Sequence, residues 1–345
     1  MPKISVIICV FNGEKHLKRA VESCANQTLS DIEIVLVDDG SSDNSGKICD
    51  EFQKSDSRIC AVHIENSGLS AARNKGMSVA CGEFITFCDA DDFIDKDAFE
   101  MMFREINKNE SDIVICGYYG DIEKNGQIIS TTKVCPEYAV ADEKKEFLKQ
   151  FVAIKSNHIF DASWNKLYRA NIIKENVLQM PVGEIFEDTK FVLDFLNCTS
   201  KITVLNRCFY HYIQRMGSIT KSYNPSKLIC LKKRRDDMEN YFGEEKNAEL
   251  TGFLSLFYIK SVYSYLIDLF FPKSKPSCGE IRKIIENELR DPSFDKALKS
   301  ATGSGIANKM TMAAARCKNV TISYLYAKTV YLLKYKMQRL FWKLK

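Results

Sequence analysis

Short apolar runs alternate with segments of helical periodicity over the first hundred residues, and no other feature constrains the fold as strongly. The runs are rich in Ile and Val, and polar residues or Gly bound them. Runs that are apolar on both faces and are separated by helices predict strands buried in a parallel sheet. The chain is therefore predicted to be an α/β protein. The expected strands are Ile4–Phe11, Ile32–Val37, Ile59–Ile64 and Phe84–Cys88, and the expected helices are Glu14–Ala25, Ser45–Lys54, Leu69–Ala80 and Lys96–Asn107.

The pattern changes after this region. Asn125-Gly126 predicts a hairpin turn, because both residues tolerate the positive φ that such turns need. Beyond about residue 225 the periodicity is helical throughout. We therefore expect a first domain over residues 1–225, with halves 1–110 and 111–225, and an α-helical extension over residues 226–345. The other expected elements are the strands Ile113–Cys116 and Ile202–Leu205 and the helices Asp142–Ile154 and Asp188–Asn197.

Composition and charge exclude several classes of protein. The chain has 345 residues, of which 45% are apolar and 27% charged, and this excludes a disordered or collagen-like protein. The net charge is +4, but residues 309–345 carry nine Lys or Arg and no Asp or Glu, which leaves −5 on residues 1–308. No nucleic-acid partner is therefore expected. The thirteen cysteines contain no CxxC pair, so we expect neither a zinc site nor a disulfide framework, and a reducing, cytoplasmic location.

Two helical segments in the last third are unusual. Leu250–Phe271 is about as long as a membrane span, but Lys260 and Asp268 lie within it, so a packed helix is expected. Near the C-terminus, apolar residues fall within about 100° of a helical wheel and basic residues lie largely opposite. Such a helix can lie on an anionic membrane surface or dock on the protein. We favour the membrane because no acidic residue balances the charge. The apolar residues are Val330, Leu333, Met337, Leu340, Phe341 and Leu344, the basic ones are Lys328, Lys336, Arg339 and Lys343, and Tyr331, Tyr335 and Trp342 flank them.

Acidic residues follow two of the predicted strands. Asp89, Asp91 and Asp92 follow the fourth run, and Asp38 and Asp39 follow the second. Because open parallel sheets bind ligands at the carboxyl ends of their strands, we expect chemistry in these loops. Two carboxylates one residue apart suit Mg²⁺ or Mn²⁺, whereas an acidic turn that caps the next helix is the alternative. The earlier pair can accept hydrogen bonds from a ribose or base, or form a local turn.

No glycine-rich phosphate loop follows the first run, where Phe11-Asn12-Gly13-Glu14 stands, and this counts against nicotinamide, flavin and P-loop chemistry. The chain instead carries spaced motifs, namely Ile4–Asn12, Asn26–Thr28, Val37–Asp43, Asn66–Asn74, Ala80–Phe84, Asp89–Asp92, Trp164–Tyr168, Phe186–Asp188 and Tyr210–Ser218. Their order resembles that of family 2 glycosyltransferases. The resemblance implies a GT-A fold, a Rossmann-like, mixed and mainly parallel sheet flanked by helices, and transfer of a sugar from a nucleoside diphosphate.

The resemblance also implies roles for residues on the donor side. Phe11 is expected to lie against the uracil of a UDP-sugar, and Asp39 to accept a hydrogen bond from the base. Asp91 is similar to the metal-ligating member of the family's DxD motif, with Asp89 near the ribose and diphosphate. Arg73 is expected to support the donor pocket. The implied cofactor is Mg²⁺ or Mn²⁺.

On the acceptor side, Glu187 and Asp188 begin a predicted helix, where carboxylates ordinarily interact with the helix dipole. The resemblance implies instead that Asp188 is the general base for the acceptor hydroxyl, with Glu187 on the acceptor side. Trp164 can stack on an acceptor sugar or be a core aromatic. Arg215 and Ser218 can form a flap over the phosphates, although a surface arginine is the simpler interpretation.

The resulting hypothesis is an inverting, metal-dependent glycosyltransferase that moves a hexose or N-acetylhexosamine from a UDP-sugar to a saccharide. The acceptor is expected to be lipid-linked, in the synthesis of a bacterial surface polysaccharide, with the protein at the cytoplasmic face of the membrane. One alternative is a non-catalytic nucleotide-sugar-binding scaffold, which has no use for the two carboxylate pairs. The other is a sugar nucleotidyltransferase, which the absence of an early glycine-rich loop disfavours.

Overall fold

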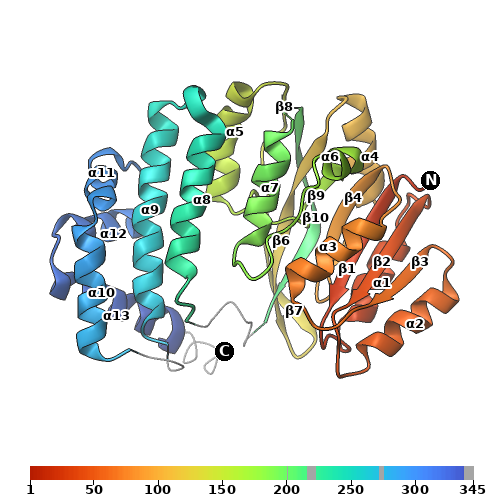
Figure 1. Ribbon diagram of the computed structural model, residues 1–345, viewed down its shortest axis with the longest axis horizontal. Helices are drawn as coiled ribbons and strands as arrows, with labels where there is room; N and C mark the ends of the chain where they lie inside the picture. The colour runs from red at the N-terminus through yellow and green to blue at the C-terminus, as the bar shows by residue number, and fades with distance from the viewer. Residues whose placement is uncertain (200, 216–222, 272–275, 338–345) are drawn as a thin grey trace. The chain divides into compact units, whose positions relative to one another are not determined.

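The computed structural model describes residues 1–199, 201–215, 223–271 and 276–337 (Figure 1). The chain divides into two compact units, Met1–Met216 and Gly217–Lys345, whereas the sequence places this boundary at about residue 225. Ser218 and the last part of the predicted amphipathic helix, from residue 338 on, lie outside the described residues, as do the side chains of Lys336 and Met337.

Four parallel strands form the first half of the sheet in the first unit. They are β1 (Ile4–Val10), β2 (Ile32–Asp38), β3 (Ile59–His63) and β4 (Phe84–Asp89), in the spatial order β3-β2-β1-β4. Strand β1 has a neighbour on each side and is buried along almost its whole length. The predicted parallel α/β arrangement is therefore confirmed (Figure 1).

A helix lies in each connection between these strands. The helices are α1 (Leu17–Ala25), α2 (Ser45–Ser55) and α3 (Leu69–Val79), and α4 (Ala98–Lys108) follows β4. Helix α3 packs closely on β1, since a Cβ atom built on Gly76 would lie 2.4 Å from Cγ2 of Ile7. Glycine permits this close approach, which brings the polar side of α3 to the edge of the sheet.

The second half of the sheet is mixed rather than parallel. Strand β9 (Lys166–Arg169) runs antiparallel between β4 and β6 (Ile113–Lys124), and β10 (Ile202–Gln214) runs parallel to β6. Asn125 and Gly126 have φ values of 52° and 78°, as the predicted hairpin requires. The remaining strands are β5 (Phe93–Ile94), β7 (Gln127–Val134) and β8 (Ala139–Ala141), and the remaining helices of this unit are α5 (Lys144–Ser156), α6 (Ala170–Glu175) and α7 (Glu187–Asn197).

Strands β6 and β10 extend well beyond the runs expected from the sequence, Ile113–Cys116 and Ile202–Leu205. Their carboxyl halves contain polar residues that are paired inside the sheet. Nδ1 of His211 lies 2.7 Å from Oδ2 of Asp121, which is fully buried. The apolar run of β10 is interrupted by the exposed Asn206 and Arg207, where its pairing with β6 shifts register, and the run of β6 is interrupted by Gly117, so both expectations were too short.

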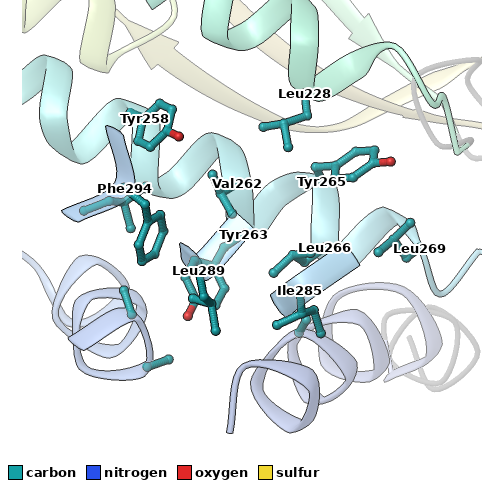
Figure 2. Close-up of a cluster of buried hydrophobic side chains, with 14 of the residues drawn as sticks. Leu228, Tyr258, Val262, Tyr263, Tyr265, Leu266, Leu269, Ile285, Leu289 and Phe294 are labelled. Carbon is teal, nitrogen blue, oxygen red and sulfur yellow. The ribbon is translucent and has the colours of Figure 1, made fainter. Parts of the chain in front are cut away.

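The second unit is helical, as predicted. Helix α9 runs through its hydrophobic core, where Leu228 of α8, Ile285 of α10 and Phe294 of α11 also lie (Figure 2). Ser277 begins α10 with a capping box, and Asn247 caps α9, so both helix starts are satisfied by side chains. The elements are α8 (Lys227–Phe242), a 3₁₀ turn (Gly243–Glu245), α9 (Ala248–Asp268), α10 (Cys278–Arg290), α11 (Pro292–Ser300), α12 (Ile306–Arg316), α13 (Val320–Tyr331) and a π-helical turn (Leu332–Met337).

Helix α9 is long and apolar enough to span a membrane by length and composition, and it is the one such helix in the described residues. Its apolar window is 61% buried inside the protein, and α8, α10, α11, α12 and α13 pack against it. A core helix of a helical unit passes the same test of length and composition. The structure therefore agrees with the packed helix predicted for this segment.

Candidate functional site

The predicted donor-side residues gather at the carboxyl edge of the parallel strands. Phe11 follows β1 and is 55% exposed, and Asp39 follows β2. Asp89 ends β4, with Asp91 in the turn after it. Because β2 and β4 pair with opposite sides of β1, this edge includes the point where the strand order reverses. Open α/β sheets bind their ligands at such a point.

Asp39 is buried and supports the loop before α3. Its Oδ1 accepts a hydrogen bond from the backbone N–H of Ser67 at 2.8 Å, and its Oδ2 accepts one from the N–H of Gly68 at 2.9 Å. A carboxylate oxygen has two lone pairs, so these bonds leave capacity for a ligand. The preceding Asp38 accepts from the N–H of Ser41 at 3.1 Å, which is the local turn that the sequence offered as an alternative.

Arg73 on α3 connects the donor side of the site to the acceptor side. Its side chain is 3% exposed. One terminal nitrogen, Nη2, lies 2.7 Å from Oδ1 of Asp89, and the other, Nη1, lies 2.8 Å from Oδ1 of Asp188 and 3.5 Å from Oε1 of Glu187. A single guanidinium therefore brings together three of the residues that the sequence singled out.

Phe186 sets the position of this acidic pair. It has φ 63° and ψ 33°, in the left-handed region, directly before α7. This conformation is uncommon and costly for a bulky residue, and such strain persists where the surroundings enforce it. Glu187 and Asp188 thereby occupy the first turn of α7, where the helix dipole favours negative charge. Glu187 and Asp188 can therefore interact with the helix dipole of α7 and contact Arg73 at the same time.

Burial and the neighbouring charges act in opposite directions on these carboxylates. Burial raises the pKa of Asp188, Arg73 lowers it and Asp89 raises it again, with a net upward shift. Burial and Asp188 likewise raise the pKa of Glu187. For Arg73, burial alone would lower the pKa, but Asp188 and Asp89 raise it above its usual value. The guanidinium is therefore the permanent charge of the cluster, and the carboxylates are the groups that titrate.

Asp91 and Asp92 have different environments although they are adjacent. The side chain of Asp91 is 54% exposed, and its Oδ2 accepts a hydrogen bond from Nη1 of Arg215 at 2.9 Å. Asp92 is buried and accepts from the hydroxyl of Tyr210 and from the N–H of Ile213, each at 2.8 Å. The Tyr210 hydroxyl also accepts from the N–H of Asp89 at 3.0 Å. Asp92 therefore connects the turn of residues Asp89–Asp92, called the acidic turn below, to β10, while the side chain of Asp91 remains exposed to water.

The residues present fit a divalent cation that binds together with a donor. In the described parts of the chain, no cluster of three or more His, Cys, Asp or Glu is arranged to hold a metal unaided. Asp91 nevertheless offers a solvent-exposed carboxylate, and Asp89 is 28% exposed beside it. Mg²⁺ and Mn²⁺ commonly take one or two carboxylates and complete their shells with substrate phosphate and water. Asp91 would hold such a cation, and the cation would neutralise charge on a diphosphate.

Trp164 lies in an aromatic stack. Its ring is 8% exposed, stacks on Tyr210 at 4.0 Å between centroids and meets Tyr118 edge-on at 5.4 Å. Of the two alternatives for Trp164, this environment favours a core aromatic over a stacking surface for an acceptor sugar, because little of the side chain is exposed. The neighbouring Lys166 is fully buried, and its Nζ donates to the carbonyl oxygen of Ile159 at 2.9 Å. Burial lowers the pKa of Lys166 to about 7.

Of three further residues near the site, His211 belongs to the motif Tyr210–Ser218, whereas Arg19 and Glu123 gave no recognisable signal in the sequence. His211 is stacked between Phe93 and Tyr119, with centroid distances of 4.1 Å and 4.7 Å, and therefore has a structural role. Arg19 of α1, 72 residues before Asp91, donates to the backbone oxygen of Asp91, and Glu123 of β6, 32 residues after Asp91, accepts from Arg19. A single charged residue in an amphipathic helix or a hairpin is ordinary, so only the fold could bring these two to the site.

The mixed sheet with acidic residues at its carboxyl edge is the architecture of a GT-A glycosyltransferase. Residues 5–177 match the family described as glycosyl transferase family 2, so the chain belongs to that family. EpsH of Bacillus subtilis (strain 168) is 37% identical over 226 residues, 64% of each chain, so this chain spans just under two thirds of EpsH. The cholesterol galactosyltransferase of Borreliella burgdorferi is 34% identical over 272 residues, 75% of this chain and 74% of that protein.

A solved structure supports the fold over almost the whole chain. The crystal structure of S. aureus TarS, residues 1–349, in complex with UDP-GlcNAc has a TM-score of 0.67. The match covers 96% of this chain and 92% of that one at 21% sequence identity. The predicted GT-A fold and the predicted membership of the family are therefore confirmed.

Replacing Arg73 should destabilise the fold in a pH-dependent way. Arg73→Met leaves three crowded carboxylates without their cation, which should lower the free energy of unfolding by about 3 kcal/mol at pH 7. Burial and repulsion then hold the folded-state pKa values of Asp188 and Glu187 above their unfolded values, so the penalty is present at pH 7 and is relieved as pH falls through the folded pKa values. Urea denaturation at pH 7 and pH 5 measures both effects.

Arg58 provides the control, because it pairs with Asp56 at the surface. Arg58→Met should cost about 1 kcal/mol or less. Adding Asp188→Asn to Arg73→Met should restore part of the lost stability by removing one unpaired charge. Equal losses for the two arginine variants, or a loss for Arg73→Met that does not change with pH, would show that the carboxylates do not depend on Arg73.

Proposed function

We propose that this glycosyltransferase moves a hexose or N-acetylhexosamine from a UDP-sugar to a saccharide hydroxyl, with inversion and with Mg²⁺ or Mn²⁺. The observation that carries the proposal is the contact of one buried arginine, Arg73, with Asp89 on one side and Asp188 on the other. The UDP-GlcNAc bound by TarS, which has the same fold, supports a nucleotide-sugar donor.

On the donor side, Phe11 offers an exposed ring beside Asp39, and these two would hold the uracil. An aromatic face against the base leaves the polar edge of the base for the carboxylate of Asp39. Asp89 would contact the ribose, and Asp91 would hold the cation at the diphosphate. A bound cation stabilises the negative charge that develops on a departing diphosphate.

On the acceptor side, Asp188 would act as the general base. Its carboxylate takes the proton of the acceptor hydroxyl while that oxygen attacks the anomeric carbon from the face opposite the diphosphate. The new glycosidic bond forms as the bond to the diphosphate oxygen breaks, and UDP leaves with the electron pair. Burial raises the pKa of Asp188 and so makes it a stronger base, while Arg73 favours its ionised form. Glu187 lies beside it and would orient the acceptor.

A lipid-linked acceptor at the membrane surface is consistent with an exposed apolar side of the second unit. Ala327 and Tyr331 bury one side of α13 in the core, as the docking alternative expected. Ile322 and Leu325 on α13, and Leu333 just after it, are exposed, Leu325 by 55%. Residues 309–345 contain no acidic residue, so this surface is suited to anionic lipids. The cholesterol galactosyltransferase, by its name, also acts on a lipid. We place the reaction at the cytoplasmic face of the membrane, in the synthesis of a bacterial surface polysaccharide.

Removing the cation ligand should abolish donor activation. We expect Asp91→Asn to lower metal-dependent release of UDP from a UDP-sugar by about 100-fold, as loss of an electrostatic stabiliser of the leaving group does. Screening a panel of UDP- and GDP-sugars with Mg²⁺ or Mn²⁺ first identifies the donor. Asp31→Asn, at the opposite end of β2, should retain wild-type turnover. Activity that persists in EDTA, or in Asp91→Asn, would contradict the metal role.

Removing the proposed general base should slow sugar transfer without weakening donor binding. Asp188→Asn should lower transfer by about 100-fold or more, while calorimetric affinity for the UDP-sugar stays within a few-fold of wild type. Asp194→Asn, on the same helix and paired with Lys190, is the control and should remain active. Wild-type kcat/KM should fall on acidification with an apparent pKa above the ordinary aspartate value of about 3.9, because burial raises the pKa of Asp188. Loss of donor binding in Asp188→Asn would place this residue on the donor side instead.

Membrane association should depend on the exposed apolar residues after residue 320. Leu325→Glu combined with Leu333→Glu should weaken co-sedimentation with phosphatidylglycerol vesicles about tenfold or more, since each leucine loses the gain from burial in lipid. Val177→Glu changes a residue of the first unit that is 74% exposed, and it should bind vesicles like the wild type. Equal binding of the double variant, or equal binding of the wild type to neutral vesicles, would exclude this surface as the membrane contact.

A further inference from the structure

Glu123 of β6 is a buried carboxylate that binds two arginines, Arg19 of α1 and Arg215 after β10, and both arginines contact the acidic turn. The Glu123 side chain is 8% exposed. Oε1 accepts a hydrogen bond from Nε of Arg215 at 2.9 Å, and Oε2 accepts one from Nη1 of Arg19, also at 2.9 Å. The β6–β7 pairing shifts register between Ile122 and Glu123, and such an irregularity re-aims a side chain.

Both arginines also reach Asp91, but they contact different atoms of it. Arg19 donates from Nη2 to the backbone oxygen of Asp91 at 2.8 Å. Arg215 donates from Nη2 to the same oxygen at 3.1 Å and from Nη1 to the carboxylate oxygen Oδ2 at 2.9 Å. Arg215 thus contacts an oxygen of the carboxylate to which we assign the cation.

Glu123 remains charged under all ordinary conditions. Its hydrogen bonds with Arg215 and Arg19 outweigh burial and hold its pKa at about 2. It therefore acts as a fixed anion that anchors the Nε edge of Arg215, rather than as a proton donor or acceptor. The opposite nitrogen, Nη1, points to Asp91, whose exposed side chain makes that ion pair a weak one.

We propose that Glu123 is a positioning residue that holds Arg215 between two partners, the carboxylate of Asp91 and a donor diphosphate. When a divalent cation takes Asp91, Nη1 loses its partner while Nε stays on Glu123, and the freed nitrogen donates to a phosphate oxygen. The inference rests on the proposed function and adds two consequences to it. Arg215 competes with the cation for Asp91 when no nucleotide is present, and cation and nucleotide bind cooperatively.

Titration with Mn²⁺ in the absence of nucleotide tests the competition. The electron paramagnetic resonance signal of aqueous Mn²⁺ disappears on binding and reports affinity without any turnover. R215M should bind Mn²⁺ about fivefold more tightly than wild type, the gain that loss of a half-exposed competing ion pair gives. R19M removes the same charge from the same network but no contact with the Asp91 carboxylate in the described residues, so it should change Mn²⁺ affinity less than twofold.

The opposite sign is expected once nucleotide is present. With saturating Mn²⁺, R215M should bind UDP about tenfold more weakly, because a charge-assisted hydrogen bond to phosphate is lost. R215K retains a positive charge near Glu123 and serves as a control for misfolding. It should show a smaller gain in Mn²⁺ affinity and a smaller loss of UDP affinity than R215M. Tightening by R19M equal to that by R215M, or no tightening by R215M and R215K, would overturn the competition.

A double-mutant cycle tests whether Glu123 acts through Arg215. E123Q removes the charge that competes with Asp91 for Arg215, so Arg215 should pair more strongly with Asp91. Nucleotide-free Mn²⁺ binding should therefore weaken about threefold, and E123Q should have no effect on the R215M background. An equal effect on both backgrounds would show a general charge effect and would overturn the positioning role. Mn²⁺ that binds with UDP but is insensitive to these variants contradicts this inference alone. Absence of Mn²⁺ binding in every variant, with and without UDP, contradicts the metal-dependent function as well.

Discussion

The ion pairs of Arg73 join the parallel half of the sheet to the start of α7, and the geometry of the candidate site depends on them. Asp89 comes from β4, and Glu187 and Asp188 come from a helix almost a hundred residues later. Each carboxylate is partly buried, and crowding them without a cation would be costly. The guanidinium of Arg73 supplies the compensating positive charge. Arg73 lies at the edge of the sheet because α3 packs closely on β1, which Gly76 permits. The site is therefore held in place by the same contacts that hold the fold.

Two arginines in the site have the same chemistry but different exposure to water. Arg73 is almost inaccessible and contacts three carboxylates, so solvent screens its pairs little. Arg215 lies against Asp91, whose side chain is more than half exposed, and solvent screens that pair. A pair of this kind can exchange partners when a ligand arrives. Burial, and not residue type, therefore separates the arginine that builds the site from the one that can respond to a ligand.

The sequence predicted the parts of the fold that depend on periodicity and missed those that depend on buried polar pairs. The strands β1 to β4 and their helices follow from alternating apolar runs, and the spaced acidic motifs predicted which loops would meet at the sheet edge. The full lengths of β6 and β10 were not predicted, because Gly117 in β6 and the exposed Asn206 and Arg207 in β10 interrupt their apolar runs. Asp39 and Asp89 lie at the predicted edge, whereas Trp164 is enclosed by aromatic rings. Arg19 and Glu123 are ordinary surface types in the sequence, and only the folded chain brings them to Asp91.

The antiparallel strand β9 pairs with β4 on one side and with β6 on the other. The parallel half of the first unit and the half that contains β6 and β10 consequently share a single hydrogen-bonded sheet. A large opening of one half against the other would require breaking these backbone ladders. Substrate entry and product exit in this unit should therefore proceed through shifts of side chains and loops at the sheet edge. Proteins with this sheet can then differ in the loops at its edge while the sheet itself stays unchanged.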